Sequence, residues 1–572
     1  METLPRDDAG KLRARTAMTP RTALRSLETA FDTYGGEAAK RKLQLLATLE
    51  RASLGTAKEV LRLHELLCFL RAYPDDTELL AAVERTLARF EKRADLRRHR
   101  RALEDSGIAG TTTRFPFFSP SARRLVERWG SRVTIDWSRF ENAERFGRIL
   151  PHLTLWSERA AFDEPDVSAR AWVRDNKGAG DTDAVFLVRR WHALAADEPV
   201  RSAFYDDLDP WLRLEPGPDT PARTREKHPG MRVVFQTGPL DRSRPDLAAE
   251  IRRAPRAVAR VVGAEAEALI ELARSAMVPR QRDLEVFAYA NPEDVRLVDA
   301  GEGLSFACIG VLPERRSLLE AVYAFLMLKN GVAVGYSLCT VLFGSSEIAY
   351  NVFESFRGGE TAKIFGRVLA TVRHLFGSRS FAIDPYQLGH GNHEGIASGA
   401  FWFYAKQGFR PVDPGVAGLL DAELRQIAKK KGYRSSPATL EKLARAYVLW
   451  PAGGKDVLGV LSVSRVSRRV SAMLAERFGA DRERAERACF AEARARLGAL
   501  PAELRRWPAP EREAFRRWAP LVALLDVERW SAKEKRDAVL VIRAKGARSE
   551  DEHLARFEAH KKLSRAVRRL AR

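Results

Sequence analysis

The chain has 572 residues, of which 45% are hydrophobic and 30% are charged, and its net charge is +21 with an isoelectric point near 10. This length exceeds one ordinary hydrophobic core, so we expect three or four domains, and the composition excludes a disordered chain. The positive charge favours anionic partners such as nucleic acid, anionic lipid or phosphorylated small molecules. A genome rich in G and C, which uses Arg where others use Lys, is an alternative explanation for the charge.

The cysteines and the apolar segments limit the classes of protein further. The four cysteines lie far apart, at positions 68, 308, 339 and 489. No pair has zinc-site spacing, so we expect no metal, and such sparse thiols suit a reducing cytoplasm. The first twenty residues lack the apolar core of a signal peptide. We expect no membrane span, because no run reaches about 18 apolar residues; the nearest candidate, 318–342, is interrupted by Lys329, Asn330 and two glycines.

The first region, residues 1–212, predicts mainly helices. Leu24, Leu27 and Phe31 recur at the three-to-four spacing of a buried helix face. The segment "YPDDTELLAAVERTLARF" has the pattern of a turn, an acidic N-cap region and a helix. Residues 213–230 are rich in Pro, Gly and charge, which predicts a linker or a long surface loop.

Residues 231–433 predict a central module of strands and helices, either α/β or α+β. Helices are predicted near 258–276 and for "SLLEAVYAFLMLKN", which ends at Asn330 and Gly331. The strand-like segments are "MRVVFQTG", "LEVFAYA", "VRLVDAG", "LSFACIGVL", "VAVGYSLCTVLF", "EIAYNVFE" and "RSFAID". From residue 434 the chain returns to helices rich in Arg, and its tail "KKLSRAVRRLAR" has six basic residues and no acidic one.

A glycine turn in "NVFESFRGGETAKIFGRVLATVRHLFG" links a predicted strand to a helix that begins near Glu360. Glycines let a ligand approach the backbone, and a helix N-terminus favours a phosphate. The guanidinium of Arg357 adds a positive charge with paired N–H donors at the same place. The alternative is a plain strand-to-helix turn that needs Gly for its geometry, and the Glu360 carboxylate would compete with a phosphate there.

The segment "SGAFWFYAKQGFRP" predicts a second notable helix. Four aromatic residues in a row, from Phe401 to Tyr404, cover every face of a helix, so we expect it to be buried almost all round. We expect Gly408 to end it in a left-handed turn. The Tyr404 hydroxyl then needs a partner, either a backbone carbonyl or a ligand.

These two segments together resemble the GNAT superfamily of N-acetyltransferases. In that family a loop of pattern Arg/Gln-x-x-Gly-x-Gly/Ala holds the pyrophosphate of acetyl-CoA; Arg357 matches its first position and Ala362 its last, and Glu360 replaces the usual Gly. The family's Tyr-x-x-x-Gly-Phe helix is matched by "YAKQGF", with Ser398 where Asn is common. The resemblance covers about residues 280–425.

The resemblance implies an α+β fold with a mostly antiparallel sheet, flanking helices and a V-shaped gap between two parallel strands. It places the acyltransferase domain at 231–433, between the mainly helical N-terminal region and a basic helical region at 434–572. The implied activity is transfer of an acetyl group from acetyl-CoA, or another acyl-CoA, to an amine acceptor.

The resemblance also implies site residues. Tyr404 would protonate the departing CoA thiolate, and Glu354 is the first candidate for the general base. Weaker candidates for the base or the acceptor pocket are Glu347, Asp384, His390, His393 and Glu394, while Asn392 could serve only as a helix cap. The residues expected to bind acyl-CoA are Asn351, Val352, Phe353, Arg357, Gly358, Gly359, Thr361 and Ala362.

Two further hypotheses stay open. One is a non-catalytic GNAT-like binding module whose basic helical arms contact nucleic acid or another anionic partner. The other is aminoacyl transfer from tRNA, which the positive charge would suit. The sequence does not identify the amine acceptor, because fold does not fix function.

Overall fold

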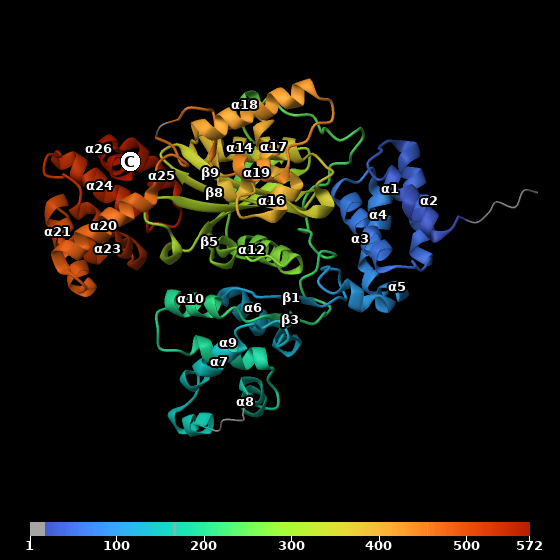
Figure 1. The fold of residues 1–572 in the computed structure, drawn as a ribbon, viewed down its shortest axis with the longest axis horizontal. Coiled ribbons are helices and arrows are strands. Elements are labelled where there is room, and N and C mark those ends of the chain that lie inside the picture. The colour runs from blue at the N-terminus through green and yellow to red at the C-terminus, as the bar shows by residue number, and fades with distance from the viewer. Residues whose placement is uncertain (1–17, 164–167, 455) are drawn as a thin grey trace, which may run out of the picture. The chain divides into compact units, whose positions relative to one another are not determined.

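The computed structural model describes residues 18–163, 168–454 and 456–572. The chain divides into two compact units, one made of the residues up to Glu104 with Phe235–Pro239, the other of Asp105–Val234 with Leu240–Arg572. The fold is mixed α+β, with a large, mostly antiparallel sheet and helical regions. Figure 1 shows the elements with their labels.

The first unit is helical, as the sequence predicts. Its α-helices are α1 (Pro20–Ala30), α2 (Gly36–Arg51), α3 (Ala57–Ala72), α4 (Thr77–Ala88) and α5 (Ala94–Arg98). A capping box in which Thr56 and Glu59 each bond the other's backbone amide begins α3. The buried Lys42 ammonium lies 2.8 Å from the Asp75 carboxylate, which compensates a charge that would otherwise be costly to bury.

The second unit begins with a small sheet and its helices. The sheet has the strand order β1-β3-β2, and β3 includes residues 213 and 214 of the expected linker. Its core contains three tryptophans, Trp129, Trp172 and Trp191. The elements are β1 (Thr113–Phe115), α6 (Ser119–Trp129), β2 (Val133–Ile135), α7 (Ala143–Ile149), α8 (Ala169–Asn176), α9 (Asp183–His192), α10 (Glu198–Leu208) and β3 (Leu212–Leu214).

A nine-stranded sheet forms the centre of the second unit, with the order β11-β12-β10-β9-β8-β7-β6-β5-β4. Its strands are β4 (Ala257–Val261), β5 (Ala290–Gly301), β6 (Leu304–Val311), β7 (Ala321–Lys329), β8 (Val332–Leu342), β9 (Ser345–Val352), β10 (Ser380–Ile383), β11 (Arg410–Pro411) and β12 (Val448–Trp450). Because β12 lies between β10 and β11, the sheet extends beyond residue 433, the expected end of the module.

The helix predicted for residues 317–330 is wrong, because Ala321–Lys329 form strand β7. This strand is buried on both faces, so its apolar residues run continuously rather than alternate. Asn330 and Gly331 both have positive φ, 51° and 79°, and they form the tight turn to the antiparallel strand β8. An Asn-Gly pair between apolar runs is a strong hairpin signal, which outweighs its value as a helix stop.

Three other predicted elements also differ from the structure. Residues 231–238 form no strand, and Glu285–Ala288 form the short helix α13 instead of a strand. The helix predicted at 258–276 is split, since β4 takes Ala257–Val261 and α12 begins only at Gly263. The strands predicted from "VRLVDAG", "LSFACIGVL", "VAVGYSLCTVLF", "EIAYNVFE" and "RSFAID" are confirmed as β5, β6, β8, β9 and β10.

Helices α14 (Thr361–Phe376) and α12 (Gly263–Met277) lie on opposite sides of the nine-stranded sheet (Figure 1). The Phe365 ring of α14 contacts the Tyr350 ring of β9, with centroids 5.1 Å apart. On β9, Ile348 and Tyr350 are therefore on the α14 side. The alternate residues Glu347 and Asn351 are only half-buried and share the opposite face.

The connections after α14 are short helices. The aromatic segment "FWFYA" is helical, as predicted, but α17 is only six residues long and follows α16 through Gly399. Gly408 has a φ of 96° after the helix. The elements are α15 (Pro385–Leu388), α16 (His393–Ser398), α17 (Ala400–Ala405), α18 (Pro414–Lys429) and α19 (Pro437–Leu443).

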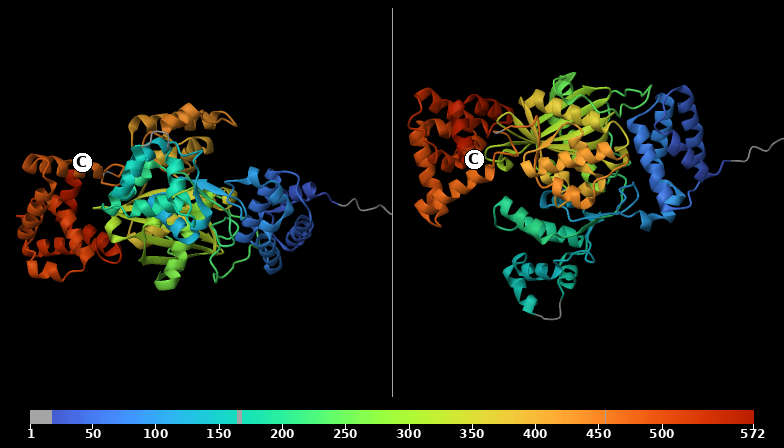
Figure 2. Two further views of the ribbon diagram at one scale, coloured as in Figure 1. Left: turned by 90° about the horizontal axis from the view of Figure 1, so that it is seen from below. Right: turned by 45° about the horizontal axis from the view of Figure 1, so that its top comes forward.

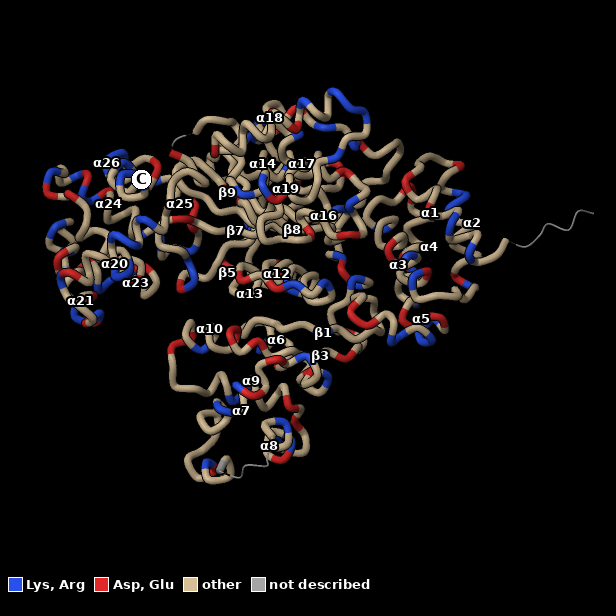
Figure 3. Tube along the Cα trace, in the orientation of Figure 1, with Lys and Arg blue, Asp and Glu red and all other residues tan. Residues whose placement is uncertain are grey.

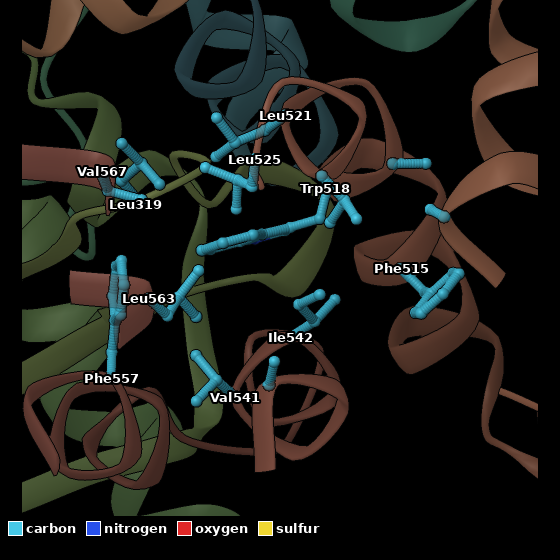
Figure 4. Close-up of a cluster of buried hydrophobic side chains, with 14 of the residues drawn as sticks. Leu319, Phe515, Trp518, Leu521, Leu525, Val541, Ile542, Phe557, Leu563 and Val567 are labelled. Atoms are coloured by element: carbon cyan, nitrogen blue, oxygen red, sulfur yellow. The ribbon is translucent and has the colours of Figure 1, made fainter. Parts of the chain in front are cut away.

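The remaining helices gather into one group with its own core (Figures 1 and 2). The indole of Trp518 is fully buried at the centre of this core, among Leu525, Val541 and Ile542 (Figure 4). The helices are α20 (Val463–Phe478), α21 (Arg482–Leu497), α22 (Pro501–Arg506), α23 (Ala509–Ala523), α24 (Ala532–Ala544), α25 (Asp551–Ala559) and α26 (Lys561–Ala571).

Candidate active site

Beyond its pairing with β10, strand β9 has an edge unpaired within the described residues, which we call the gap. These strands run parallel, and their register ends at Glu347 of β9. From there to Val352, β9 pairs only with β8 among the described strands. The Phe353 amide donates to the Val334 carbonyl of β8 at 2.9 Å. Because amides alternate along a strand, those of Val352 and Tyr350 point the other way, into the gap.

The three predicted acyl-CoA residues at the end of β9 differ in their environments. Val352 is buried, and its carbonyl accepts a hydrogen bond from the Arg357 guanidinium at 3.2 Å. Phe353 is also buried, with the Arg280 guanidinium 3.6 Å from its ring centroid. Asn351 is half-buried, and its buried Oδ1 has no hydrogen-bond partner among the described residues. An unsatisfied buried acceptor of this kind requires an explanation such as a ligand or water.

The turn between β9 and α14 holds the predicted phosphate-binding glycines. The Gly359 amide donates to the Phe356 carbonyl at 2.9 Å. Gly358 is exposed, and a Cβ added there would meet no atom within 4 Å. No side chain caps α14, and the amides of Thr361 and Ala362 donate to no carbonyl of the described residues. The turn therefore offers free backbone donors beside open space, as anion binding at a helix N-terminus requires.

Glu360 is engaged elsewhere. Its buried carboxylate lies 3.0 Å from the Lys329 ammonium and 3.1 Å from that of Lys363. The small cavity beside this cluster is also lined by Glu302 and Arg367. Because two lysines compensate the Glu360 charge, its expected repulsion of a phosphate is reduced.

Arg357 is already paired. Its guanidinium lies 2.6 Å from the Glu394 carboxylate of α16, and Arg282 approaches the same carboxylate at 3.4 Å. The Arg357 hydrogen bond lowers the pKa of Glu394. The side chains of Arg357 and Glu394 are 43% and 55% exposed, and exposed pairs contribute only about 0–1 kcal/mol, so an incoming phosphate could displace the carboxylate.

Tyr404 is buried in an aromatic cluster on the α14 side of the sheet. Its ring lies within 6.0 Å, between centroids, of Phe365, Phe403 and Phe409. Burial raises the pKa of its phenol, which is protonated at neutral pH. No hydrogen bond joins this hydroxyl to another described residue. The backbone carbonyl considered as its partner is therefore not found in this part of the chain.

A cluster of acidic and phenolic side chains lies where the gap begins, and it includes Glu347 and Asp384, two of the weaker candidates from the sequence. Burial raises the pKa of Glu347 on β9, and the nearby charge of Asp384 raises it further. The Tyr447 hydroxyl donates to the Glu347 carboxylate at 3.1 Å, and burial raises the pKa of Tyr447. Asp384 follows β10 and caps α15 by accepting the Tyr386 amide at 2.7 Å. A half-buried carboxylate with a raised pKa is suited to accept a proton near neutral pH.

The other predicted acid–base residues lie on the surface. Glu354 is exposed in the short turn after β9, and His390, His393 and Glu394 are exposed around α15 and α16. Asn392 caps α16, since its side chain accepts the Gly395 amide at 3.1 Å. Across the described ranges, no group of three or more His, Cys, Asp or Glu side chains could hold a metal ion.

Tyr447 had no signal in the sequence. It lies 100 residues from Glu347 along the chain, and only the insertion of β12 between β10 and β11 brings the two together. Glu347 and Asn351 had a weak signal, because polar residues alternate with apolar ones along β9.

Comparison of the chain with family models, with curated proteins and with solved structures found no match. In the described part of the chain, no helix has both the length and the apolar character needed to cross a bilayer.

Proposed function

We propose that residues 257–450 form an acyl-CoA-dependent N-acyltransferase domain of the GNAT type, which transfers an acetyl or longer acyl group to an amine. The observation that carries this proposal is the parallel pair β9 and β10, whose pairing ends at Glu347 within an otherwise antiparallel sheet and leaves the end of β9 with an open edge. An extended ligand can pair with the open edge of β9, as in the addition of a strand to a sheet edge.

The glycine turn supports a nucleotide at the end of this gap. The uncapped amides of α14 and the open space beside Gly358 fit a pyrophosphate. The pantetheine arm would then run along the amides of Val352 and Tyr350. The Arg357 guanidinium would leave the Glu394 carboxylate and bind a phosphate instead. A charge-assisted, bidentate contact with the phosphate would favour this change.

The two faces of the sheet supply different groups to the reaction. On one face, the Glu347 carboxylate would accept the proton of the amine as its nitrogen attacks the thioester carbonyl. The C–N bond forms, the C–S bond breaks, and the Tyr404 phenol, held on the α14 side, would give its proton to the departing thiolate. Glu347 replaces Glu354 as our first candidate base, because Glu347 is half-buried with a raised pKa and Glu354 is exposed.

Two carboxylates beside the gap also bear on the acceptor. Glu347 and Asp384 would attract a cationic amine rather than an anionic acceptor. We therefore propose a primary amine that carries no acidic group near the reacting nitrogen. An aminoacyl group on tRNA fits this site less well, since the phosphates of the tRNA would approach the same carboxylates.

The Arg357–Glu394 ion pair favours a second candidate function, a non-catalytic module that has this fold but binds no CoA. In such a module the pair would be a permanent surface contact. A measurement of CoA binding separates the two candidates.

The test is thermal unfolding of the full chain with and without CoA. At a CoA concentration 100 times its Kd, binding would stabilise the protein by about 2.7 kcal/mol, which corresponds to a rise of roughly 2–3 °C in the midpoint for a chain of this length. The variant Arg357→Glu should lose this rise. Arg373→Glu, at the exposed far end of the same helix, should keep it. No rise in the unmodified protein, or equal loss in both variants, would support the non-catalytic module.

A further inference from the structure

The positive charge is concentrated at the end of the chain. Residues 434–572 contain 32 basic and 18 acidic residues, so this quarter of the chain carries +14 of the total charge of +21. A uniform bias toward Arg would spread the excess along the chain. The concentration therefore points to a function of this region. Figure 3 shows where Lys and Arg lie along the chain.

Within this region, two helices that contact each other carry a group of exposed cations. On α20, Arg465, Arg468 and Arg469 are exposed at three-to-four spacing, which places them on one side of the helix. On α26, Arg565 and Arg569 are exposed four residues apart. The two helices contact each other at their ends, where the Ser462 amide donates to the Ala571 carbonyl at 3.2 Å and the Arg465 guanidinium donates to the Arg572 carbonyl. We call these five arginines the α20–α26 face.

None of the five forms an ion pair within 4.0 Å with an Asp or Glu side chain of the described residues. Other arginines of the same region are paired, for example Arg516 and Arg517 with Glu513. Few acidic residues lie on these two helices. The acidic residues of α20 are limited to Glu476, and α26 has none. The face therefore presents positive charge that no Asp or Glu side chain of the described residues neutralises.

The face continues into a cleft of about 490 Å³ beside α26. Arg565 lies on the face and also lines the cleft. The cleft is lined by two further exposed cations, Arg379 and Lys561. Two carboxylates, Asp456 and Glu558, also line it, and both lie within 4.0 Å of Arg568. The cleft thus remains positive on balance and could receive a phosphate.

The helices that carry the arginines pack against a hydrophobic core. The apolar sides of α20 and α26 belong to the core around Trp518, through Val466, Leu563 and Val567, which are each 1% exposed. A fixed row of cations loses less entropy on binding than a flexible tail does. The same burial argues against a membrane, because these apolar side chains cannot insert into a lipid surface.

Two features favour a double-stranded nucleic acid over a single strand. Helix α26 has 11 residues and is about 16 Å long at 1.5 Å per residue, and duplex DNA carries one negative charge per about 1.7 Å of its axis, so several phosphates could lie along the helix. Single-strand binders stack bases on exposed aromatic rings. In the described part of residues 456–572, the exposed large apolar side chains are Val460, Leu500 and Leu540, with no aromatic ring among them.

We propose that the α20–α26 face binds the phosphate backbone of a double-stranded nucleic acid without reading its sequence. This inference does not depend on the acyltransferase proposal. Arginines on a rigid helix pair would contact phosphates and release counterions, so the affinity would fall steeply as salt rises.

The test measures the affinity of the full chain for fluorescent 20-base-pair RNA and DNA duplexes between 50 and 200 mM salt. The triple variant Arg465→Gln, Arg469→Gln and Arg569→Gln removes three contacts from the face. We expect about tenfold weaker binding or more, and a log–log salt slope lower in magnitude by about 2.7, at roughly 0.9 per phosphate lost. Both duplexes should show the loss.

The matched control removes three exposed arginines from α21, through Arg482→Gln, Arg484→Gln and Arg487→Gln. It has the same net charge as the face variant, so its affinity should fall much less and its slope should stay close to that of the unmodified protein. Equal loss in the two variants would overturn the proposal, because the effect would then follow net charge alone. So would unchanged binding in the face variant, or face-dependent binding to anionic vesicles without binding to either duplex.

Discussion

Two regions of the molecule carry opposite charge: the gap between β9 and β10 is lined by carboxylates, whereas the α20–α26 face is lined by arginines. Two carboxylates lie beside the gap. Glu347 is half-buried near Asp384, and it accepts a hydrogen bond from the Tyr447 hydroxyl. The α20–α26 face carries exposed arginines that no Asp or Glu side chain of the described residues neutralises. This difference is the basis on which we propose a cationic amine for the gap and a double-stranded nucleic acid for the face. The difference shows that a net charge of +21 is not a property of the whole surface, and that its location decides which ligand each region can attract.

The largest expected effect concerns the proposed base in the gap. Glu347→Gln should lower kcat by about 10²- to 10⁴-fold, the usual contribution of general acid–base catalysis. The amide keeps the size of the side chain and can still accept the Tyr447 hydroxyl, so the fold should persist. Steady-state transfer from acetyl-CoA to a primary amine measures the effect. Activity equal to that of the unmodified protein would remove Glu347 from the reaction, and Glu354→Gln is the matched comparison.

Tyr404→Phe should lower kcat by about 10²-fold, because the phenol no longer donates a proton to the thiolate. Affinity for CoA should change little, since the ring and its contacts with Phe365 and Phe409 remain. Measuring kcat and the Kd for CoA on the same preparation separates the two roles. A variant with full kcat would show that the buried hydroxyl is only part of the aromatic core.

The proposed base should make activity depend on pH. The base must be ionised, so activity should fall as the pH drops through the pKa of Glu347, which burial and Asp384 raise. Asp384→Asn removes a negative neighbour, so the pKa of Glu347 should decrease and the acid limb of the kcat/KM profile should move to lower pH. Asn also caps helices well, which preserves α15. An acid limb that stays in place would mean that another group controls it.

The smallest effect is expected for an arginine that already has carboxylate partners. Arg516 is paired with Glu513 and Glu486, and its side chain is 43% exposed. Arg516→Gln should therefore change the free energy of unfolding by only about 0–1 kcal/mol and leave duplex binding unchanged. Denaturant unfolding and duplex titration measure both. Weaker duplex binding would extend the nucleic-acid surface beyond the α20–α26 face.

The sequence predicted local features more successfully than the contacts between distant segments. Strands β5, β6, β8, β9 and β10 and helix α14 follow from their own residues, because their patterns and turns are local. Strand β7 was missed, since a strand buried on both faces lacks the alternation that marks a half-buried one. The Asn330–Gly331 turn carried the missing information.

The candidate site was only partly predictable for the same reason. The positions of Gly358 and Tyr404 follow from local motifs, and the structure leaves open space at one and an unbonded hydroxyl at the other. The Arg357–Glu394 pair and the contact of Tyr447 with Glu347 join segments 37 and 100 residues apart. Such contacts depend on the order of strands in the sheet, which no local pattern in this chain specifies.

Amide hydrogen exchange of the full chain with saturating CoA tests the central claim most directly. The account predicts that peptides covering Ile348–Phe353 and Gly358–Phe365 gain protection, because their amides would bond the pantetheine arm and the pyrophosphate, while α20 and α26 stay unchanged. Protection that appears elsewhere, or no protection at any CoA concentration, would contradict the claim that this gap holds an acyl-CoA.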